Sequence, residues 1–277
     1  MRKKLTLLTF LISLTIFLAS CVSTNFGFHI PEDSRDQFVR IIQQAYVSIC
    51  AEEGCVTNPL RSSGSGAIVA ESTKGSYILT AGHVCELEIE SIVRTPEMLK
   101  MVNGIEVHMS IVNLSQSKYK AQIVSIDNNS DLCLLFSRNY WNEKGPAKIA
   151  DSPVFEGERV YNVAAPVGIF YENVVPLLEG FYMGRDGLRA YYSIPAMGGS
   201  SGSPIYNIRG HIVGMIHSVN VAFPMVSVSP TQKELKKFLK SNIEAHKKDL
   251  AYIDKKIQTN KTRSVEPFWK FLGLNNI

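Results

Sequence analysis

The feature that most constrains the fold of this chain is a series of short apolar runs between residues 64 and 228. Gly, Asn, Asp and Ser separate these runs, which lie at residues 66–70, 77–80, 122–126, 132–136, 160–165, 191–194, 205–208, 211–216 and 225–228. Many short strands between turn residues are typical of an all-β barrel or sandwich. With 45% hydrophobic residues in 277, the chain has enough apolar material for a buried core, which excludes a disordered protein.

Helical patterns flank this β region on both sides. Residues 31–47 carry apolar side chains at helical spacing and predict an N-terminal helix. Ser229-Pro230-Thr231 predicts the start of a longer C-terminal helix. Its first half is expected to pack on the β domain, and its Lys-rich remainder either to face solvent or to meet anionic lipid or a partner helix. The apolar stripe of this helix consists of Leu239, Ile243, His246, Leu250, Ile253 and Ile257.

The first twenty residues have the pattern of an export signal. Three basic residues at 2–4 precede an uncharged apolar run over residues 5–18. That run is too short to span a hydrocarbon core of about 30 Å, so it predicts a signal peptide. The sequence Leu18-Ala19-Ser20-Cys21 resembles the lipobox of bacterial lipoproteins, which implies that an acylated Cys21 anchors the protein to a membrane surface. An ordinary secretory signal cut near Ser20 is the alternative.

The charge is unevenly distributed along the chain. The formal net charge is +4, of which residues 2–4 supply three. Residues 21–228 hold 15 basic and 20 acidic residues, whereas residues 229–263 hold ten basic and four acidic ones. A mildly acidic body with a basic tail gives no indication of a nucleic-acid partner.

Three segments carry side chains suited to nucleophilic catalysis. An apolar strand ends in Thr80-Ala-Gly-His83-Val, a second begins with Asp131-Leu-Cys-Leu-Leu, and a Gly-rich loop presents Ser201 within Gly198–Pro204. A serine hydroxyl becomes a good nucleophile when a histidine takes its proton and a carboxylate holds that histidine in place. Glycines beside the serine let backbone N–H groups turn toward an oxygen that becomes negative.

Taken together, the three motifs resemble those of trypsin-fold serine proteases of the bacterial HtrA-like and glutamyl endopeptidase types. The resemblance covers about residues 60–240 and implies two six-stranded antiparallel β-barrels with the catalytic residues in the cleft between them, followed by a C-terminal helix. By position it implies that Ser201 is the nucleophile, His83 the general base and Asp131 the orienting carboxylate, with Asp127 as a fallback. The N–H groups of Gly199 and Ser201 would form the oxyanion hole. No metal or cofactor is implied.

The residues that would select the substrate are less well defined. Pro195 occupies the place where trypsin-like enzymes carry the Asp that selects basic residues, so cleavage after Lys or Arg is not expected. Glutamyl endopeptidases read an acidic side chain with a His two residues past the Gly of the following strand, whereas here His217 lies three past Gly214. Because successive side chains of a strand point to opposite faces, the His217 side chain should point away from the substrate pocket unless a β-bulge turns it back. The candidate pocket residues are Pro195, Ile216, His217 and Ser218.

Four cysteines remain after Cys21. Cys50 and Cys55 are close enough in sequence to form a disulfide. Cys85 and Cys133 each lie two residues past a candidate catalytic residue, so they are either neighbours or separate buried thiols. No Cys-x2-Cys spacing occurs, and no metal site is predicted.

These observations define an expected organisation and function. Residues 1–20 form the lipoprotein signal, 21–54 a tether and N-terminal helix, 55–228 the double-barrel protease domain, and 229–277 the basic helix and tail. The expected protein is a lipid-anchored serine endopeptidase of a bacterial cell envelope, of host or phage origin, acting on proteins or peptides. The alternatives are an esterase-type hydrolase that uses Ser200, which also fits Gly-x-Ser-x-Gly, and a protease-fold lipoprotein that binds partners without catalysis.

Overall fold

The structure is a computed structural model that describes residues 33–263, except residues 53, 88–92, 94, 173 and 221, with side chains as far as Lys255. The predicted signal peptide and Cys21 lie outside the described residues, as do residues 264–277. None of the helices in the described ranges is both long enough and apolar enough to cross a membrane.

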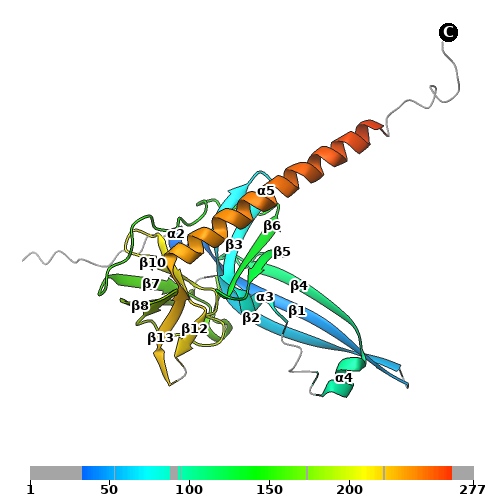
Figure 1. Ribbon diagram of the computed structural model, residues 1–277, viewed down its shortest axis with the longest axis horizontal. Helices are drawn as coiled ribbons and strands as arrows, with labels where there is room; N and C mark the ends of the chain where they lie inside the picture. Colours follow the sequence, from blue (N-terminus) through cyan, green and yellow to red (C-terminus); the bar gives the residue numbers. More distant parts are fainter. Residues whose placement is uncertain are drawn as a thin grey trace, which may run out of the picture. The chain divides into compact units, whose positions relative to one another are not determined.

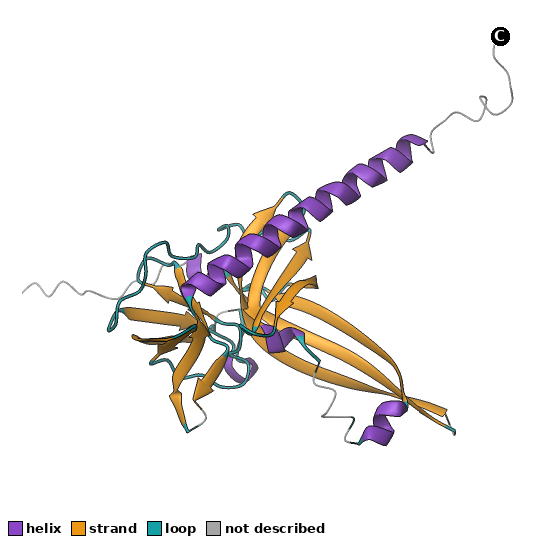
Figure 2. Cartoon of the chain, in the orientation of Figure 1, coloured by secondary structure: helices purple, strands orange, loops and turns teal. Residues whose placement is uncertain are grey.

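The first sheet is a closed antiparallel barrel with the strand order β1-β2-β3-β6-β5-β4 (Figures 1 and 2). In the closed part of the barrel each strand pairs with two neighbours, so no strand edge is exposed there. The core is formed by apolar residues such as Ile68, Ile78 and Leu135, which are fully buried. The strands are β1 (Phe38–Ala51), β2 (Gly54–Ser72), β3 (Gly75–Ala81), β4 (Val102–Val112), β5 (Lys118–Asp127) and β6 (Leu132–Arg138).

The second sheet has seven strands in the order β11-β10-β7-β8-β9-β13-β12. It curls around its own apolar core, but it differs from the expected closed barrel of six strands. The extra strand arises because regular pairing is interrupted at Ile216 and His217 and resumes only at β12. At the interruption, Ile216 N–H donates to Ser203 O and His217 N–H donates to Val228 O. The strands are β7 (Arg159–Val163), β8 (Leu177–Asp186), β9 (Arg189–Tyr192), β10 (Pro204–Asn207), β11 (Ile212–Met215), β12 (Ser218–Asn220) and β13 (Phe223–Pro230).

The N-terminal helix predicted for residues 31–47 is wrong. The described part of this segment holds only one helical turn, α2 (Asp33–Asp36), and then continues as β1. Its apolar residues fit a helical spacing because both faces of β1 are covered at this end, so that Val39, Ile41 and Ile42 are all buried. β-branched residues of this kind favour a strand once partner strands are present on both sides.

The predicted C-terminal helix is confirmed as α5 (Gln232–Arg263). Leu235, Phe238 and Leu239 are buried in its first turns. Further along, the ring of His246 packs against Tyr77 and Phe136 of the barrel, and its Nδ1 lies 3.1 Å from the Tyr77 hydroxyl. Beyond Leu250 the apolar side chains Tyr252 and Ile253 are exposed.

Three strands extend beyond the closed part of the barrel. β2 pairs with β3 only from Ala67 onward, and β4 pairs with β5 only from Met109 onward. Residues 44–51 of β1, 54–61 of β2 and 102–108 of β4 therefore form a separate three-stranded ribbon with β1 in its centre, and we call this ribbon the arm. The short helix α4 (Pro96–Lys100) precedes its third strand.

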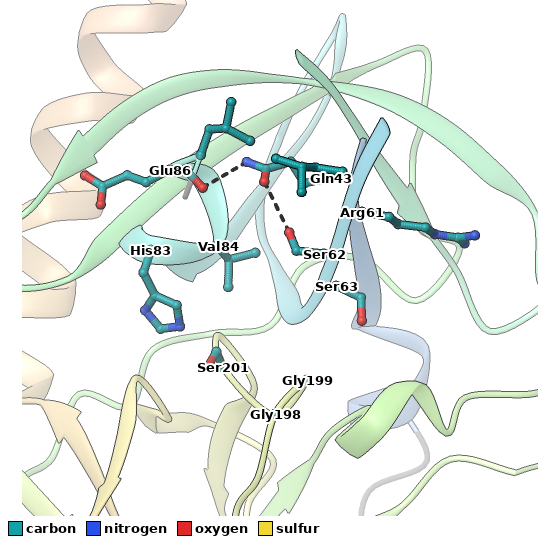
Figure 3. Close-up of a pocket in the computed structure, with 12 residues that line it drawn as sticks. Gln43, Arg61, Ser62, Ser63, His83, Val84, Glu86, Gly198, Gly199 and Ser201 are labelled. Atoms are coloured by element: carbon teal, nitrogen blue, oxygen red, sulfur yellow. Dashed lines mark hydrogen bonds between the residues drawn. The ribbon is translucent and has the colours of Figure 1, made fainter. Parts of the chain in front are cut away.

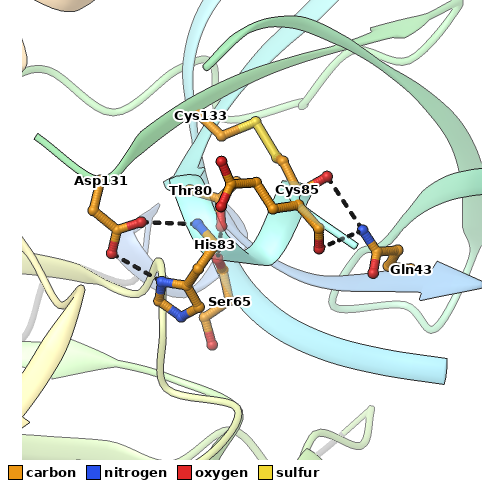
Figure 4. Close-up of a disulfide and its surroundings, with 8 residues drawn as sticks. Gln43, Ser65, Thr80, His83, Cys85, Asp131 and Cys133 are labelled. Carbon is orange, nitrogen blue, oxygen red and sulfur yellow. Dashed lines mark hydrogen bonds and ion pairs between the residues drawn. A yellow bond between two sulfur atoms is a disulfide. The ribbon is translucent and has the colours of Figure 1, made fainter. Parts of the chain in front are cut away.

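Two disulfides connect the four remaining cysteines. Cys50 and Cys55 face each other across β1 and β2 at the tip of the arm. Cys85 lies at the end of the short helix α3 (Gly82–Cys85), and its bond to Cys133 joins that helix to β6 (Figure 4). Of the alternatives left open by the sequence, the neighbouring pair is the one observed.

The two disulfides should differ in their contribution to stability. The Cys85–Cys133 bond spans 48 positions and the Cys50–Cys55 bond spans 5. Loop-closure entropy then predicts a loss of about 4 kcal/mol for the double variant Cys85→Ala/Cys133→Ala and about 2 kcal/mol for Cys50→Ala/Cys55→Ala. Urea unfolding of both variants beside the parent protein measures these differences. Equal losses would contradict the prediction.

Candidate active site

The pairing of β3 with β6 places His83 beside Asp131. Ala81 at the end of β3 lies opposite Leu132 at the start of β6, so the residues that follow one strand and precede the other meet. The Asp131 carboxylate accepts two hydrogen bonds from His83: one from the backbone N–H to Oδ1 and one from Nδ1 to Oδ2, both 2.8 Å (Figure 4). This double contact sets the orientation of the imidazole ring and leaves its Nε2 atom directed away from the carboxylate.

A close approach of two backbones makes this contact possible. Asp131 has a φ of 50°, in the left-handed region that non-glycine residues seldom adopt. A Cβ atom on Gly82 would lie 2.8 Å from Asp131 Oδ1 and 3.1 Å from its carbonyl carbon. The glycine before His83 therefore gives the carboxylate room to reach the histidine.

A second histidine contacts the same carboxylate. His217 Nδ1 lies 3.3 Å from Asp131 Oδ2, and only 16% of the His217 side chain is exposed. Burial by itself would raise the pKa of Asp131, but the hydrogen bonds from His217 and His83 lower that pKa well below its usual range. Asp131 is therefore ionised over the whole physiological pH range.

The loop that carries Ser201 consists of two successive turns. Ser200 N–H donates to Met197 O at 2.9 Å, and Ser203 N–H donates to Ser200 O at 3.0 Å. Each turn has a glycine with positive φ at its third position, Gly199 at 93° and Gly202 at 86°, which is the pattern of a type II turn. A Cβ on Gly202 would lie 2.1 Å from Ser65 O, so no other residue fits there.

This double turn leaves two N–H groups available. The N–H groups of Ser200, Gly202 and Ser203 all donate to backbone carbonyls, whereas those of Gly199 and Ser201 make no hydrogen bond within the described part of the chain. The carbonyl of Gly198 accepts from Val167 N–H at 2.6 Å. Because C=O and N–H point in opposite directions across a trans peptide, the Gly199 N–H points away from Val167. Two donors are thus presented beside the Ser201 side chain.

Ser65 holds this loop against the first barrel. Its N–H donates to Ser201 O at 2.8 Å, and its hydroxyl donates to Gly199 O at 2.7 Å while accepting from Ala165 N–H at 3.0 Å. Ala165 directly precedes the short 3-10 helix η2 (Pro166–Gly168), which lies between β7 and β8 of the second sheet. The sequence reasoning missed this fully buried serine, although its place between two glycines, Gly64 and Gly66, was a usable signal.

His83, Gly199 and Ser201 line one cavity of about 340 Å³. Figure 3 shows the His83 ring pointing toward Ser201 across this space. Residues 60–63 of β2 form another wall. Gln43 closes the cavity from β1: its Nε2 donates to the carbonyls of Cys85 and Glu86, and its Oε1 accepts from Ser62.

The other candidate residues lie away from this cavity wall. Pro195, Ile216, His217 and Ser218 do not line it. Ile216 is buried and His217 contacts Asp131. Ser200 is 1% exposed, and its hydroxyl accepts from the Met197 N–H at 3.4 Å. The fallback carboxylate Asp127 caps the turn that follows β5 by accepting from Asn129 N–H.

Comparisons with solved structures show which fold this is. A crystal structure of the Rv3671c protease from M. tuberculosis in its active form superposes with a TM-score of 0.52 at 14% identity, over 76% of this chain and 82% of that chain. The HtrA-type protease AlgW with a decapeptide superposes with a TM-score of 0.58 at 16% identity, over 76% of this chain and 65% of that one. This chain therefore spans slightly less than two thirds of that HtrA-type protease.

Sequence comparison identifies the family. No curated protein matches the sequence. The family described as Trypsin-like peptidase domain matches residues 64–215, a stretch that contains His83, Asp131 and Ser201. Because this match spans more than half of the chain and the fold agrees with it, the chain belongs to the trypsin-like peptidase family.

Proposed function

We propose that this protein is a serine endopeptidase that hydrolyses peptide bonds through an acyl-enzyme on Ser201. The observation that carries the proposal is a histidine held by a carboxylate and pointing toward a serine beside two available N–H groups. Family membership supports protein or peptide substrates. Each part of this arrangement has a role in acyl transfer.

The proposed reaction uses these groups in turn. His83 takes the proton of Ser201 as Oγ attacks the substrate carbonyl carbon, and the carbonyl oxygen becomes an oxyanion that accepts hydrogen bonds from Gly199 and Ser201 N–H. His83 then gives its proton to the leaving amine, the peptide C–N bond breaks, and an ester to Ser201 remains. A water molecule then loses a proton to His83 and attacks the ester carbon. The bond to Ser201 Oγ breaks, His83 returns the proton to Oγ, and the carboxylic acid product is released. Asp131 stays ionised throughout and stabilises the protonated His83.

The two alternative functions receive less support. An esterase reaction on Ser200 would need an accessible nucleophile, but Ser200 is 1% exposed and its hydroxyl is already paired. A role in binding alone gives no reason for the two-point contact between His83 and Asp131 or for the N–H groups presented beside Ser201.

His217 has a positioning role in this proposal. Its Nδ1 contacts the same oxygen of Asp131 as His83 Nδ1 does. The contact therefore limits rotation of the carboxylate and partly offsets the negative charge on Oδ2. The backbone of His217 is itself fixed, because its N–H donates to Val228 O at 3.0 Å. This proposed role is distinct from the substrate contact that the sequence analysis considered for His217.

A fluorophosphonate probe tests the proposed nucleophile. We expect a single adduct on Ser201, found by peptide mass mapping, that is lost in Ser201→Ala and retained in the matched variant Ser200→Ala. Labelling should become faster as the pH rises, because only the neutral form of His83 can accept the Ser201 proton. An adduct on Ser200, or none on the folded protein, would overturn the proposal.

Replacing His217 tests its positioning role. In His217→Ala we expect kcat/KM for a peptide substrate to fall about tenfold, because hydrogen bonds to charged acceptors are among the stronger ones. The acid limb of the pH–rate profile should also move to higher pH, since Asp131 would then stabilise a protonated His83 more strongly. His217→Asn keeps an N–H donor and should recover part of the rate. An unmoved acid limb would indicate a purely structural role.

We also propose that an acylated Cys21 anchors the enzyme to a bacterial envelope membrane, on the periplasmic or extracellular face. The apolar run over residues 5–18 and the lipobox-like Leu18-Ala19-Ser20-Cys21 support this. The two disulfides of the described domain are compatible with an oxidising compartment.

Metabolic labelling in a bacterial host with an alkyne fatty acid tests the anchor. The full-length protein should incorporate label and sediment with membranes. Cys21→Ser should lose the label and leave the membrane fraction. Label that persists in Cys21→Ser, or a soluble unlabelled parent, would contradict the proposal.

A further inference from the structure

Along the arm, one edge of β2 pairs with none of the strands that the structure describes, and we call it the free edge. On one side β2 pairs with β1 without interruption from Gly54 to Ala67. On the other side pairing with β3 starts only at Ala67. Between these points, no strand among the described residues covers the outer edge of β2, which is unusual because exposed edges are available for pairing with another chain.

The register identifies the groups that point outward from this edge. Ser65 N–H donates to Ser201 O, which lies on the side away from β1. Because backbone groups alternate in direction along an antiparallel strand, the N–H and C=O groups of Ser63, Arg61 and Thr57 point the same way. Pro59 is also in this set, and proline is found in sheets where its missing N–H would face solvent.

This edge leads directly from the proposed catalytic residues. Residues 60–63 line the same cavity as His83 and Ser201. From Ser63 to Thr57 the edge runs for about 20 Å at about 3.3 Å per residue, in the direction of the Cys50–Cys55 disulfide. The disulfide joins the ends of β1 and β2, so the edge is held in extended form before any partner binds.

The position of His83 decides which part of a substrate this edge faces. In the proposed reaction His83 hands its proton to the leaving amine, so the leaving segment lies on the His83 side of Ser201. His83, Val84 and β2 all belong to the first barrel and line the cavity together. A segment that leaves past His83 therefore meets the outer edge of β2.

We propose that the free edge of β2 binds the substrate segment that follows the scissile bond as an added β-strand. This proposal rests on the proposed peptidase function and specifies its substrate class: chains with about eight residues in extended form after the cleavage site. Backbone hydrogen bonds to Ser63, Arg61 and Thr57 supply binding that does not depend on the substrate sequence.

Side chains on one face of the arm should add a preference for apolar substrate residues. Leu60, together with Val56, lies on the same face as Val47 and Ile105, because these residues are opposite one another or in alternate positions in the register. Val56 on the edge strand is 63% exposed, whereas Val47 on the central strand β1 is buried. Side chains at alternate positions of a strand added beside β2 would lie next to Leu60 and Val56, so apolar residues at every second position should favour binding.

A series of peptides tests the proposal. The shortest casein-derived peptide that the enzyme cleaves is kept constant before the scissile bond and given two, four, six or eight residues after it. We expect kcat/KM to rise about tenfold between the two-residue and the eight-residue forms, because each added backbone hydrogen bond contributes modestly. N-methylation of the eight-residue form should abolish this gain at one set of alternate residues and leave it intact at the other.

Variants of the edge provide a matched control. Thr57→Pro removes one outward N–H and Thr57→Ala keeps it, while both lose the hydroxyl contact with Ser48. The ratio of kcat/KM for the long and short peptides should fall in Thr57→Pro alone. Pro59→Ala adds an outward N–H and should raise that ratio.

The outcomes separate this proposal from the proposed function. If short and long peptides are cleaved equally fast, or N-methylation shows no alternation, the edge does not bind substrate although the enzyme is a peptidase. If no peptide is cleaved, the proposed function fails. Fluorescence anisotropy with Ser201→Ala, using fluorescein-labelled casein fragments of four and twelve residues, then tests the edge by itself, and binding that is independent of length would overturn the proposal.

Discussion

The hydrogen bonds of Ser65 are the interaction on which the rest of the site depends. Through its N–H and its hydroxyl this one buried residue binds Ser201 O, Gly199 O and Ala165 N, and its own carbonyl accepts from Thr80 at 2.8 Å. The histidine and its carboxylate belong to one sheet, whereas the serine loop belongs to the other. The contacts of Ser65 fix the serine loop relative to the first barrel, and small displacements between reacting groups are costly in rate.

Strand β2 connects the candidate active site with the arm. β2 carries Ser65 at the junction of the sheets. Away from this junction it continues outward past the cavity, where no described strand pairs with its outer edge. β2 is paired within the barrel at one end and is joined to β1 by the Cys50–Cys55 disulfide at the other. Ser65, which holds the Ser201 loop, and the proposed substrate edge are therefore parts of one continuous strand.

Much of the candidate site could be predicted because its signals are local. Each of His83, Asp131 and Ser201 lies in a short motif at a strand end, and glycines mark the positions where the backbone must approach closely or adopt positive φ. The prediction of an N-terminal helix was wrong for the opposite reason. Apolar residues on both faces of β1 imitate a helical period, and only the partner strands β2 and β4 decide between the two structures.

The sequence by itself determined the β class, the C-terminal helix and the candidate chemical groups, because turn residues, periodicity and short motifs act within a few residues of each other. Only the tertiary structure decided that Cys85 meets Cys133, that His217 contacts Asp131 instead of lining the cavity, and that Ser65 joins the sheets. These contacts depend on strand register and on the packing of one sheet against another, and neither is encoded in any single stretch of the chain.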